Sequence, residues 1–294
     1  MSRNYKDYFI FLFFITVLNF LGPLAMFLPA PFFILGRKFS FSSLLIMSFF
    51  PLLLFFPLLA NDKLSLYLTL LHYGCMVIPS LLIIYLKTKF GFSAFAKLFF
   101  SALGILLFVF AVSYVFNHYF DGGIFNELSQ RFFEASNLSK QDLEYLKTIF
   151  EYGGIAMIFF SESIFFLFNA VYFSKNGGVL DDFLFFKAPW HIVVFAVIFV
   201  LLVNFLWFFN LLTGKTLFVV AVVSAFLFFI FFAQGLAIYL FFLKRLGIGS
   251  FAKVIFIMLI FIYPMPFLLT LIGITDFWID FRNRIIRLGG GKVV

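Results

Sequence analysis

Residues 8–35 read YFIFLFFITVLNFLGPLAMFLPAPFFIL, an uncharged stretch that runs almost directly into the basic pair Arg37 and Lys38. A helix needs about 20 apolar residues to cross the hydrocarbon core of a bilayer, so this stretch is long enough to enter a membrane. Proline removes a backbone donor and glycine weakens a helix, so the stretch cannot form one regular helix. We therefore expect two short membrane passes, or one broken pass. The interrupting residues are Gly22, Pro23, Pro29 and Pro31.

The composition extends this interpretation to the whole chain. Hydrophobic residues make up 64% of the 294 positions and charged residues only 12%, which is more apolar surface than a soluble core can bury. The apolar runs lack the short alternating pattern of outer-membrane strands. The sequence therefore predicts an all-α fold, a polytopic bundle of transmembrane helices. The Lys and Arg residues lie in short loops beside these runs and mark membrane topology, so we expect no nucleic-acid binding despite the net charge of +8.

Seven further apolar runs follow the opening stretch, which gives eight or nine spans. With the N-terminus in the cytoplasm, most Lys and Arg residues fall on the inner side, as the positive-inside rule requires. We therefore expect a multi-pass membrane protein with its N-terminus in the cytoplasm. The last run contains Pro264 and Pro266, and a re-entrant path there would return the basic tail to the cytoplasm; the side of the tail stays open. The runs are 39–60, 64–86, 98–117, 153–173, 190–212, 216–243 and 254–273.

Two polar segments lie outside these runs. Residues 117–152 are expected to form an extracytoplasmic cap, with an amphipathic helix that begins after Ser139; it is either a lid or a solvated connector. Residues 274–288 place apolar side chains on one helical face and charged ones, including Asp276, on the other. This tail is expected to lie along the membrane surface or to dock a partner. The interface residues are Trp278, Arg282, Arg284 and Arg287.

Polar residues within the apolar runs are candidates for function, because a charge in the bilayer is costly. Glu162 is the clearest, and Asn169 lies two helical turns further on, so both side chains can line one ligand site. The alternative is that Glu162 only joins helices. Single polar residues such as His72 and Gln234 are interpreted as interhelical hydrogen bonds. Small residues spaced by four permit close helix packing, at Ala221 and Ala225 and at Ala233 and Ala237.

No catalytic signature is found. Asp181 and Asp182 lack a third acid for a metal–diphosphate motif, the three histidines are dispersed, and no phosphate-binding loop occurs. We therefore expect a protein that is not an enzyme and that needs no cofactor or metal.

Several strings resemble one family in their order along the chain: PAPF at 29–32 before the basic pair, FKAPW at 186–190, FAQGLAIY at 232–239 and LIGITDFWIDFR at 271–282. Together they are similar to the bacterial DUF2232 family of YybS-like membrane proteins. This resemblance implies a distant likeness to the substrate-binding S components of energy-coupling-factor transporters. It implies an S-component-like half at 1–175, membrane helices at 176–273 and the amphipathic tail at 274–294.

Two functions follow as hypotheses. The first is a subunit that binds or transports a small-molecule ligand in a cavity beneath the cap, with Glu162 and Asn169 among its contacts; a membrane partner subunit is possible, and the energy source stays open. The second is a membrane scaffold or assembly factor that recruits a partner through the C-terminal helix. In both, the protein's surroundings are the lipid bilayer.

Overall fold

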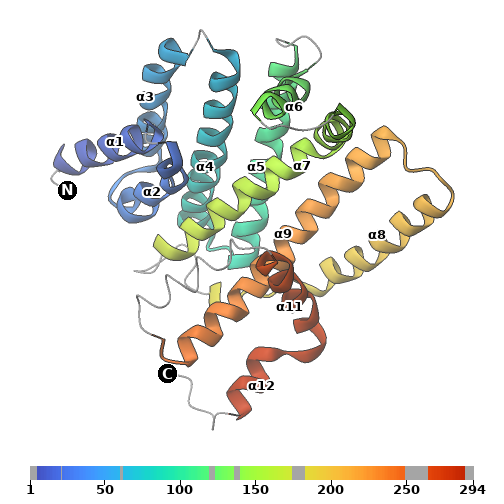
Figure 1. Cartoon of the computed structure of the whole chain (residues 1–294). Coiled ribbons are helices and arrows are strands. Elements are labelled where there is room, and N and C mark those ends of the chain that lie inside the picture. Colours follow the sequence, from blue (N-terminus) through green and yellow to red (C-terminus); the bar gives the residue numbers. More distant parts are fainter. Residues whose placement is uncertain are drawn as a thin grey trace. The chain divides into compact units, whose positions relative to one another are not determined.

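The structure is a computed structural model, and it describes residues 5–20, 22–59, 62–118, 123–135, 140–173, 183–248 and 264–288. Every regular element in these ranges is a helix (Figure 1). The chain divides into two compact units. The N-terminal unit comprises residues 1–181 and 213–222, and the C-terminal unit comprises residues 182–212 and 223–294.

The opening stretch is broken, as the sequence predicts. It forms α1 (Tyr5–Phe20), the 3-10 helix η1 (Gly22–Phe27) and the short helix α2 (Ala30–Leu35), followed by the 3-10 turn η2 (Gly36–Lys38). Pro29 has no backbone N–H, so the carbonyl of Ala25 cannot accept an α-helical hydrogen bond. It accepts a 3-10 bond from Leu28 instead, with N···O 2.9 Å. Helix α1 packs on both η1 and α2, and η1 and α2 both contact α7 (Lys140–Phe173).

Three helices form the middle of the N-terminal unit: α3 (Phe41–Leu59), α4 (Lys63–Phe90) and α5 (Ala94–Asn117). Figure 1 shows α4 beside α3 and α5, and α4 packs on both. Gly74 permits close contact between α4 and α5, because an added Cβ would lie 2.0 Å from the ring of Phe108. The hydroxyl of Tyr67 shares a hydrogen bond of 3.0 Å with Ser113 of α5.

The boundaries of α4 follow standard capping chemistry. Asp62 accepts a hydrogen bond of 3.1 Å from the backbone N–H of Leu64, and Gly91 ends the helix in the left-handed conformation with φ 59°. The hydroxyl of Ser65 also donates to the Asp62 carboxylate, at 2.6 Å. The hydrogen bond from Ser65 is the main cause that holds the pKa of Asp62 below 3.8, and Arg131 adds to it.

The cap segment differs from the expectation. We expected an amphipathic helix separate from the span that starts at residue 153, but α7 is one helix of 34 residues that runs through both. Helix α6 (Ile124–Ala135) packs on α7, where an added Cβ at Gly154 would lie 2.5 Å from the ring of Phe125. Two glycines in succession suggest a helix break, but Gly154 instead makes room for the aromatic ring. Ser139, the predicted start of the cap helix, lies outside the described residues.

The C-terminal unit contains the 3-10 turn η3 (Phe183–Phe185), α8 (Trp190–Phe208), part of α9 (Gly214–Arg245), α11 (Met265–Ile279) and α12 (Phe281–Leu288). Helix α8 is apolar apart from His191 and Asn204, and Val193 is its one buried residue. It packs through Val193 on Leu227 and Phe231 of α9, with Phe277 of α11 alongside.

Helices α9 and α11 approach to backbone contact at two glycines. An added Cβ at Gly235 would lie 1.8 Å from the carbonyl oxygen of Leu269, and one at Gly273 would lie 2.0 Å from that of Phe231. No side chain fits between the helices at this point. The close approach of α9 and α11 takes place at Gly235 and Gly273, which the four-residue alanine spacing did not identify.

The predicted tail helix over 274–288 is wrong in its continuity. Helix α11 ends at Ile279, Asp280 adopts the left-handed conformation with φ 49°, and α12 then begins at Phe281. Aspartate tolerates this conformation better than most residues. The break changes which residues share a face, so Asp276 and Arg282 are buried instead of exposed.

Candidate functional site

The ionisable residue that the sequence analysis singled out, Glu162, has a partner in the N-terminal unit. Nδ1 of His72 on α4 lies 2.9 Å and 3.1 Å from the two carboxylate oxygens of Glu162 on α7. The side chains are mostly buried, with 22% of His72 and 12% of Glu162 exposed. The structure therefore joins two residues that the sequence analysis considered separately.

Asn169 lies two turns along α7 and holds the broken opening stretch. Its Nδ2 donates to the carbonyl of Met26 in η1 at 2.6 Å and to that of Phe165 at 2.8 Å. The break at Pro29 disrupts the local helical hydrogen bonding, and a side chain from another helix pairs with a carbonyl there. The neighbouring backbone of Ala25 also lies within hydrogen-bonding reach of the His72 ring. Helices α4, α7 and η1 thus meet at one place.

Three polar atoms on α4 and α7 are buried without a hydrogen-bond partner among the described residues: Nε2 of His72, Oγ of Ser163 and Oδ1 of Asn169. A buried polar group without a partner costs about 1–3 kcal/mol. Both amide hydrogens of Asn169 are used, so its oxygen can only accept a hydrogen bond. We name this group, together with Glu162 and the carbonyls of Ala25 and Met26, the polar site. It can pair with further donors and acceptors that the described chain does not supply.

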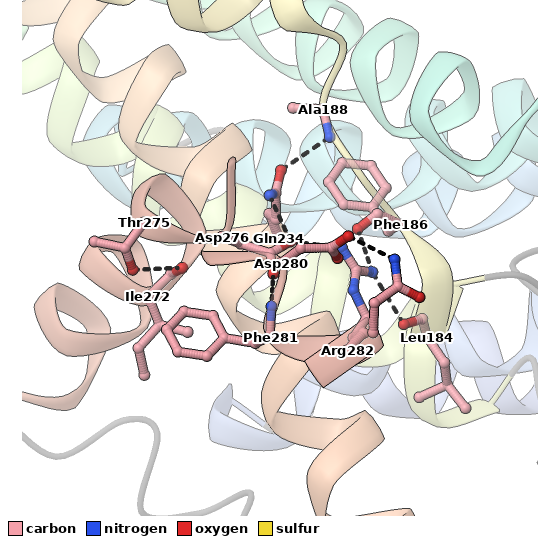
Figure 2. Close-up of polar contacts among 11 residues, drawn as sticks. Leu184, Phe186, Ala188, Gln234, Ile272, Thr275, Asp276, Asp280, Phe281 and Arg282 are labelled. Carbon is pink, nitrogen blue, oxygen red and sulfur yellow. Dashed lines mark hydrogen bonds and ion pairs between the residues drawn. The ribbon is translucent and has the colours of Figure 1, made fainter. Parts of the chain in front are cut away.

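A second polar cluster lies in the C-terminal unit and is shown in Figure 2. Asp276, which is fully buried, accepts from Nη2 of Arg282 at 2.8 Å and from Nε2 of Gln234 at 3.1 Å. Its other oxygen accepts from the backbone N–H of Phe281 at 3.0 Å and so caps the start of α12. A buried charge is stable only when it is paired and hydrogen-bonded, and Asp276 meets both conditions.

The same cluster fixes the chain between η3 and α8. Nη1 of Arg282 donates to the carbonyls of Leu184 at 3.2 Å and Phe186 at 2.9 Å, and Oε1 of Gln234 accepts from the N–H of Ala188 at 2.9 Å (Figure 2). These residues have partners in the chain itself, so the cluster stabilises the unit and offers little to a ligand. The polar site is therefore the stronger candidate for function.

The remaining predicted residues separate into buried and exposed groups. Ala233, Gln234 and Ala237 are buried on α9, whereas Ala221 and Ala225 are half-buried. Among the predicted interface residues, Trp278 is 64% exposed and Arg284 is exposed, which leaves both available to lipid. The prediction that Arg282 lies at the membrane interface is wrong, because its side chain is buried in the C-terminal unit. Arg287 lies in α12, and its side chain is outside the described set.

Sequence reasoning expected an interhelical hydrogen bond at His72, and the structure has one, but the reasoning did not identify Glu162 as its partner, and it missed the burial of Asp276. One signal was available for His72: an acid within a membrane span needs a partner, and a histidine in another span is the natural one. For Asp276 the helical periodicity predicted an exposed position, because the prediction assumed one unbroken helix over 274–288. The glycine contact between α9 and α11 had only a weak signal, since single glycines are common in membrane helices.

Among the described residues, five helices are long and apolar enough to cross a membrane: Lys63–Lys87, Ala94–Asn117, Thr148–Phe173, Trp190–Phe208 and Gly214–Arg245. Shorter apolar helices cover Leu24–Leu35, Phe41–Leu54 and Met265–Ile279. These helices define the chain as a multi-pass helical membrane protein, with the count of eight or nine spans still a prediction. The chain matches no protein-family model, no curated protein and no solved structure at a significant level.

Proposed function

We propose that this protein is a non-enzymatic membrane subunit that binds or transports a small hydrogen-bonding molecule at the polar site of its N-terminal unit. The observation that carries the proposal is the set of buried polar atoms on α4 and α7 that have no hydrogen-bond partner among the described residues. Non-helical backbone at membrane depth is tolerated where it is buried in protein or lines a site. Broken helices are also where transporters bind their substrates.

The donors and acceptors at this site restrict the chemistry of the ligand. Asn169 offers an acceptor only, so the ligand must donate a hydrogen bond to it. Ser163 can donate or accept, and Glu162 is an acceptor when ionised. A molecule with at least one N–H or O–H group fits this set, whereas a hydrocarbon does not.

Substitution of Ser163 by Ala separates a ligand contact from a structural role. The Ser163 hydroxyl has no described partner, so its removal should leave the ligand-free protein as stable as the wild type, or more stable. If a ligand bonds to this hydroxyl, affinity should fall about fivefold, which corresponds to one hydrogen bond of about 1 kcal/mol. The matched control is Ser80→Ala on α4, where the buried hydroxyl already donates to the carbonyl of Met76 at 2.6 Å.

The measurement is native mass spectrometry of the protein purified in detergent, with the bound fraction of any co-purified small molecule compared among the three forms. The proposal expects a bound molecule in the wild type and in Ser80→Ala, and a reduced bound fraction in Ser163→Ala. A wild-type spectrum with no small-molecule adduct, or equal bound fractions in all three forms, would overturn it.

The proposal also covers the orientation of the chain in the membrane and its relationship to a protein family. We place the N-terminus in the cytoplasm of a bacterium, with the chain in the inner membrane and residues 117–152 outside, because this arrangement puts most basic loops on the inner side. We keep the relationship to the DUF2232 family as a proposal that rests on the sequence strings, and a membrane partner subunit would be needed for transport.

A scaffold role is the second candidate, and the exposed side chains of Trp278 and Arg284 favour it. Removal of the whole tail is a poor test, because it would also remove the buried pair Asp276 and Arg282. Arg284→Glu reverses an exposed charge without touching that pair. A scaffold should lose its partner in pull-down experiments with this variant while ligand binding at the polar site is unchanged; retention of every partner would contradict the scaffold role.

A further inference from the structure

His72 and Glu162 make a pair whose hydrogen positions depend on the number of protons it holds. Nδ1 faces the carboxylate at 2.9 Å, and Nε2 has no partner among the described residues. When Glu162 is ionised and His72 is neutral, the hydrogen must lie on Nδ1, because two lone pairs would otherwise face each other. Nε2 is then a bare acceptor.

Addition of one proton gives the same result at Nε2 by either route. If the proton stays on the ring, His72 is a cation with hydrogens on both nitrogens. If Glu162 takes the proton and donates it to Nδ1, the ring hydrogen lies on Nε2. Both forms of the pair are neutral overall, which a low-dielectric setting favours over a net charge. One proton therefore converts Nε2 from an acceptor into a donor.

An acceptor for that donor is close by. The Ala25 carbonyl lies within hydrogen-bonding reach of the His72 ring, and it has lost its α-helical donor because residue 29 is proline. It accepts one bond from Leu28, and a carbonyl oxygen can accept two. The next carbonyl, that of Met26, is already held by Asn169 at 2.6 Å.

We propose that His72 and Glu162 form a proton-binding site that takes up one proton as a unit, and that the proton bonds Nε2 to the Ala25 carbonyl. Asn169 holds η1 on α7 at all times, whereas His72 holds it on α4 only when the proton is present. Proton uptake thus ties the broken stretch to both helices. No bound molecule is required, so this inference can succeed where the proposed ligand binding fails, and the reverse.

The other titratable groups near the pair are few in the described part of the chain. Cys75 lies one turn along α4, and the Glu162 carboxylate acts electrostatically on its thiol; the thiol is buried and forms no disulfide. The hydroxyl of Tyr73 donates to the carbonyl of Ser48 at 2.6 Å, and that of Tyr67 bonds to Ser113. None of these bonds competes for Nε2.

The chain has three histidines, so His118→Gln with His191→Gln leaves His72 as the only one to observe. The experiment is nitrogen-15 NMR of histidine-labelled protein in lipid nanodiscs, recorded as a function of pH. The proposal expects a bare Nε2 and a protonated Nδ1 at high pH, and a single transition in which Nε2 gains a hydrogen. A hydrogen on Nε2 at every pH with none on Nδ1 would overturn it.

Infrared spectra of the same samples report the carboxyl group, and Glu162→Gln identifies its band by loss. The carboxyl and ring signals should change together in one step that takes up one proton per chain. Glu162→Asp keeps the carboxyl but withdraws it from the ring by one methylene, so it should split this step into two. Separate steps for ring and carboxyl in the unsubstituted pair would overturn the shared site.

The role of Ala25 is tested by Pro29→Ala, which supplies the missing N–H that can compete for the Ala25 carbonyl. The Nε2–H resonance of the protonated form should then move toward that of a weakly bonded imidazole. An unchanged resonance would overturn Ala25 as the acceptor.

Discussion

Substitution of Gly235 by Ala should destabilise the C-terminal unit strongly for a change of one methyl group. The new Cβ would lie 1.8 Å from the carbonyl oxygen of Leu269, whereas ordinary contact begins at 3.4 Å, so α9 and α11 must separate by about 3.4 − 1.8 = 1.6 Å. The adjacent Gln234 would move with α9, and its bond to Asp276, now 3.1 Å, would pass out of range.

The expected cost follows from these two effects. Overpacking costs about 1–3 kcal/mol, and a hydrogen bond to a charged group is worth about 1.5–3 kcal/mol. Alanine returns about 0.8 kcal/mol because it favours the helix more than glycine does. The free energy of unfolding should therefore fall by about 2–5 kcal/mol. The assay is reversible unfolding in mixed micelles with increasing sodium dodecyl sulfate, followed by tryptophan fluorescence.

Gly153→Ala on α7 is the matched control, because an added Cβ there meets nothing within 4 Å. It carries the same change of helix propensity without the collision, and should raise the free energy of unfolding by about 0.8 kcal/mol. If Gly235→Ala were as stable as the wild type, the close contact between α9 and α11 would be refuted.

Three further results are expected. Arg282→Met leaves the buried carboxylate beside it uncompensated and should cost about 3–5 kcal/mol in the unfolding assay, whereas Arg284→Met on the exposed surface should stay within about 0.5 kcal/mol of the wild type. Gly154→Ala should cost about 1 kcal/mol because the Cβ meets the ring of Phe125, and equal stability with Gly153→Ala would contradict the α6–α7 contact. The native-state pKa of Asp62 is lowered, so its stabilisation is present above the unfolded pKa near 3.8 and is lost as the pH falls through the native value. The destabilisation caused by Asp62→Ala, measured by unfolding at pH 7, should therefore shrink in acid; a difference that does not change with pH would contradict this role.

The sequence predicted the elements that depend on local pattern. The start of α8 at Trp190, the long apolar helices and the break around Pro29 follow from hydropathy and from the missing N–H of proline. The continuity of α7 through Gly153 and Gly154 did not follow, since it depends on the ring of Phe125 from another helix. Local pattern does not identify which side chain fills the space beside a glycine.

In the candidate site, too, local pattern predicts single residues but not the residues that they contact. Glu162 and Asn169 could be selected from the sequence because polar groups within membrane spans are costly. Their partners, His72 and the carbonyl of Met26, could not be assigned, because no periodicity links α7 to α4 or to η1. The burial of Asp276 likewise depends on a break at Asp280 that a single left-handed residue creates.

The continuity of α7 has a mechanical consequence. Its 34 residues make a rod about 51 Å long, at 1.5 Å per residue, and Glu162 lies about 33 Å from the end at Lys140. The part before Thr148 lies outside the apolar span, and α6 rests on the rod near Gly154. A rigid rod cannot tilt at one end alone. A force applied to α6 outside the membrane would therefore move the Glu162 carboxylate relative to His72. Through α7, a contact at α6 and proton binding by the His72–Glu162 pair would influence each other.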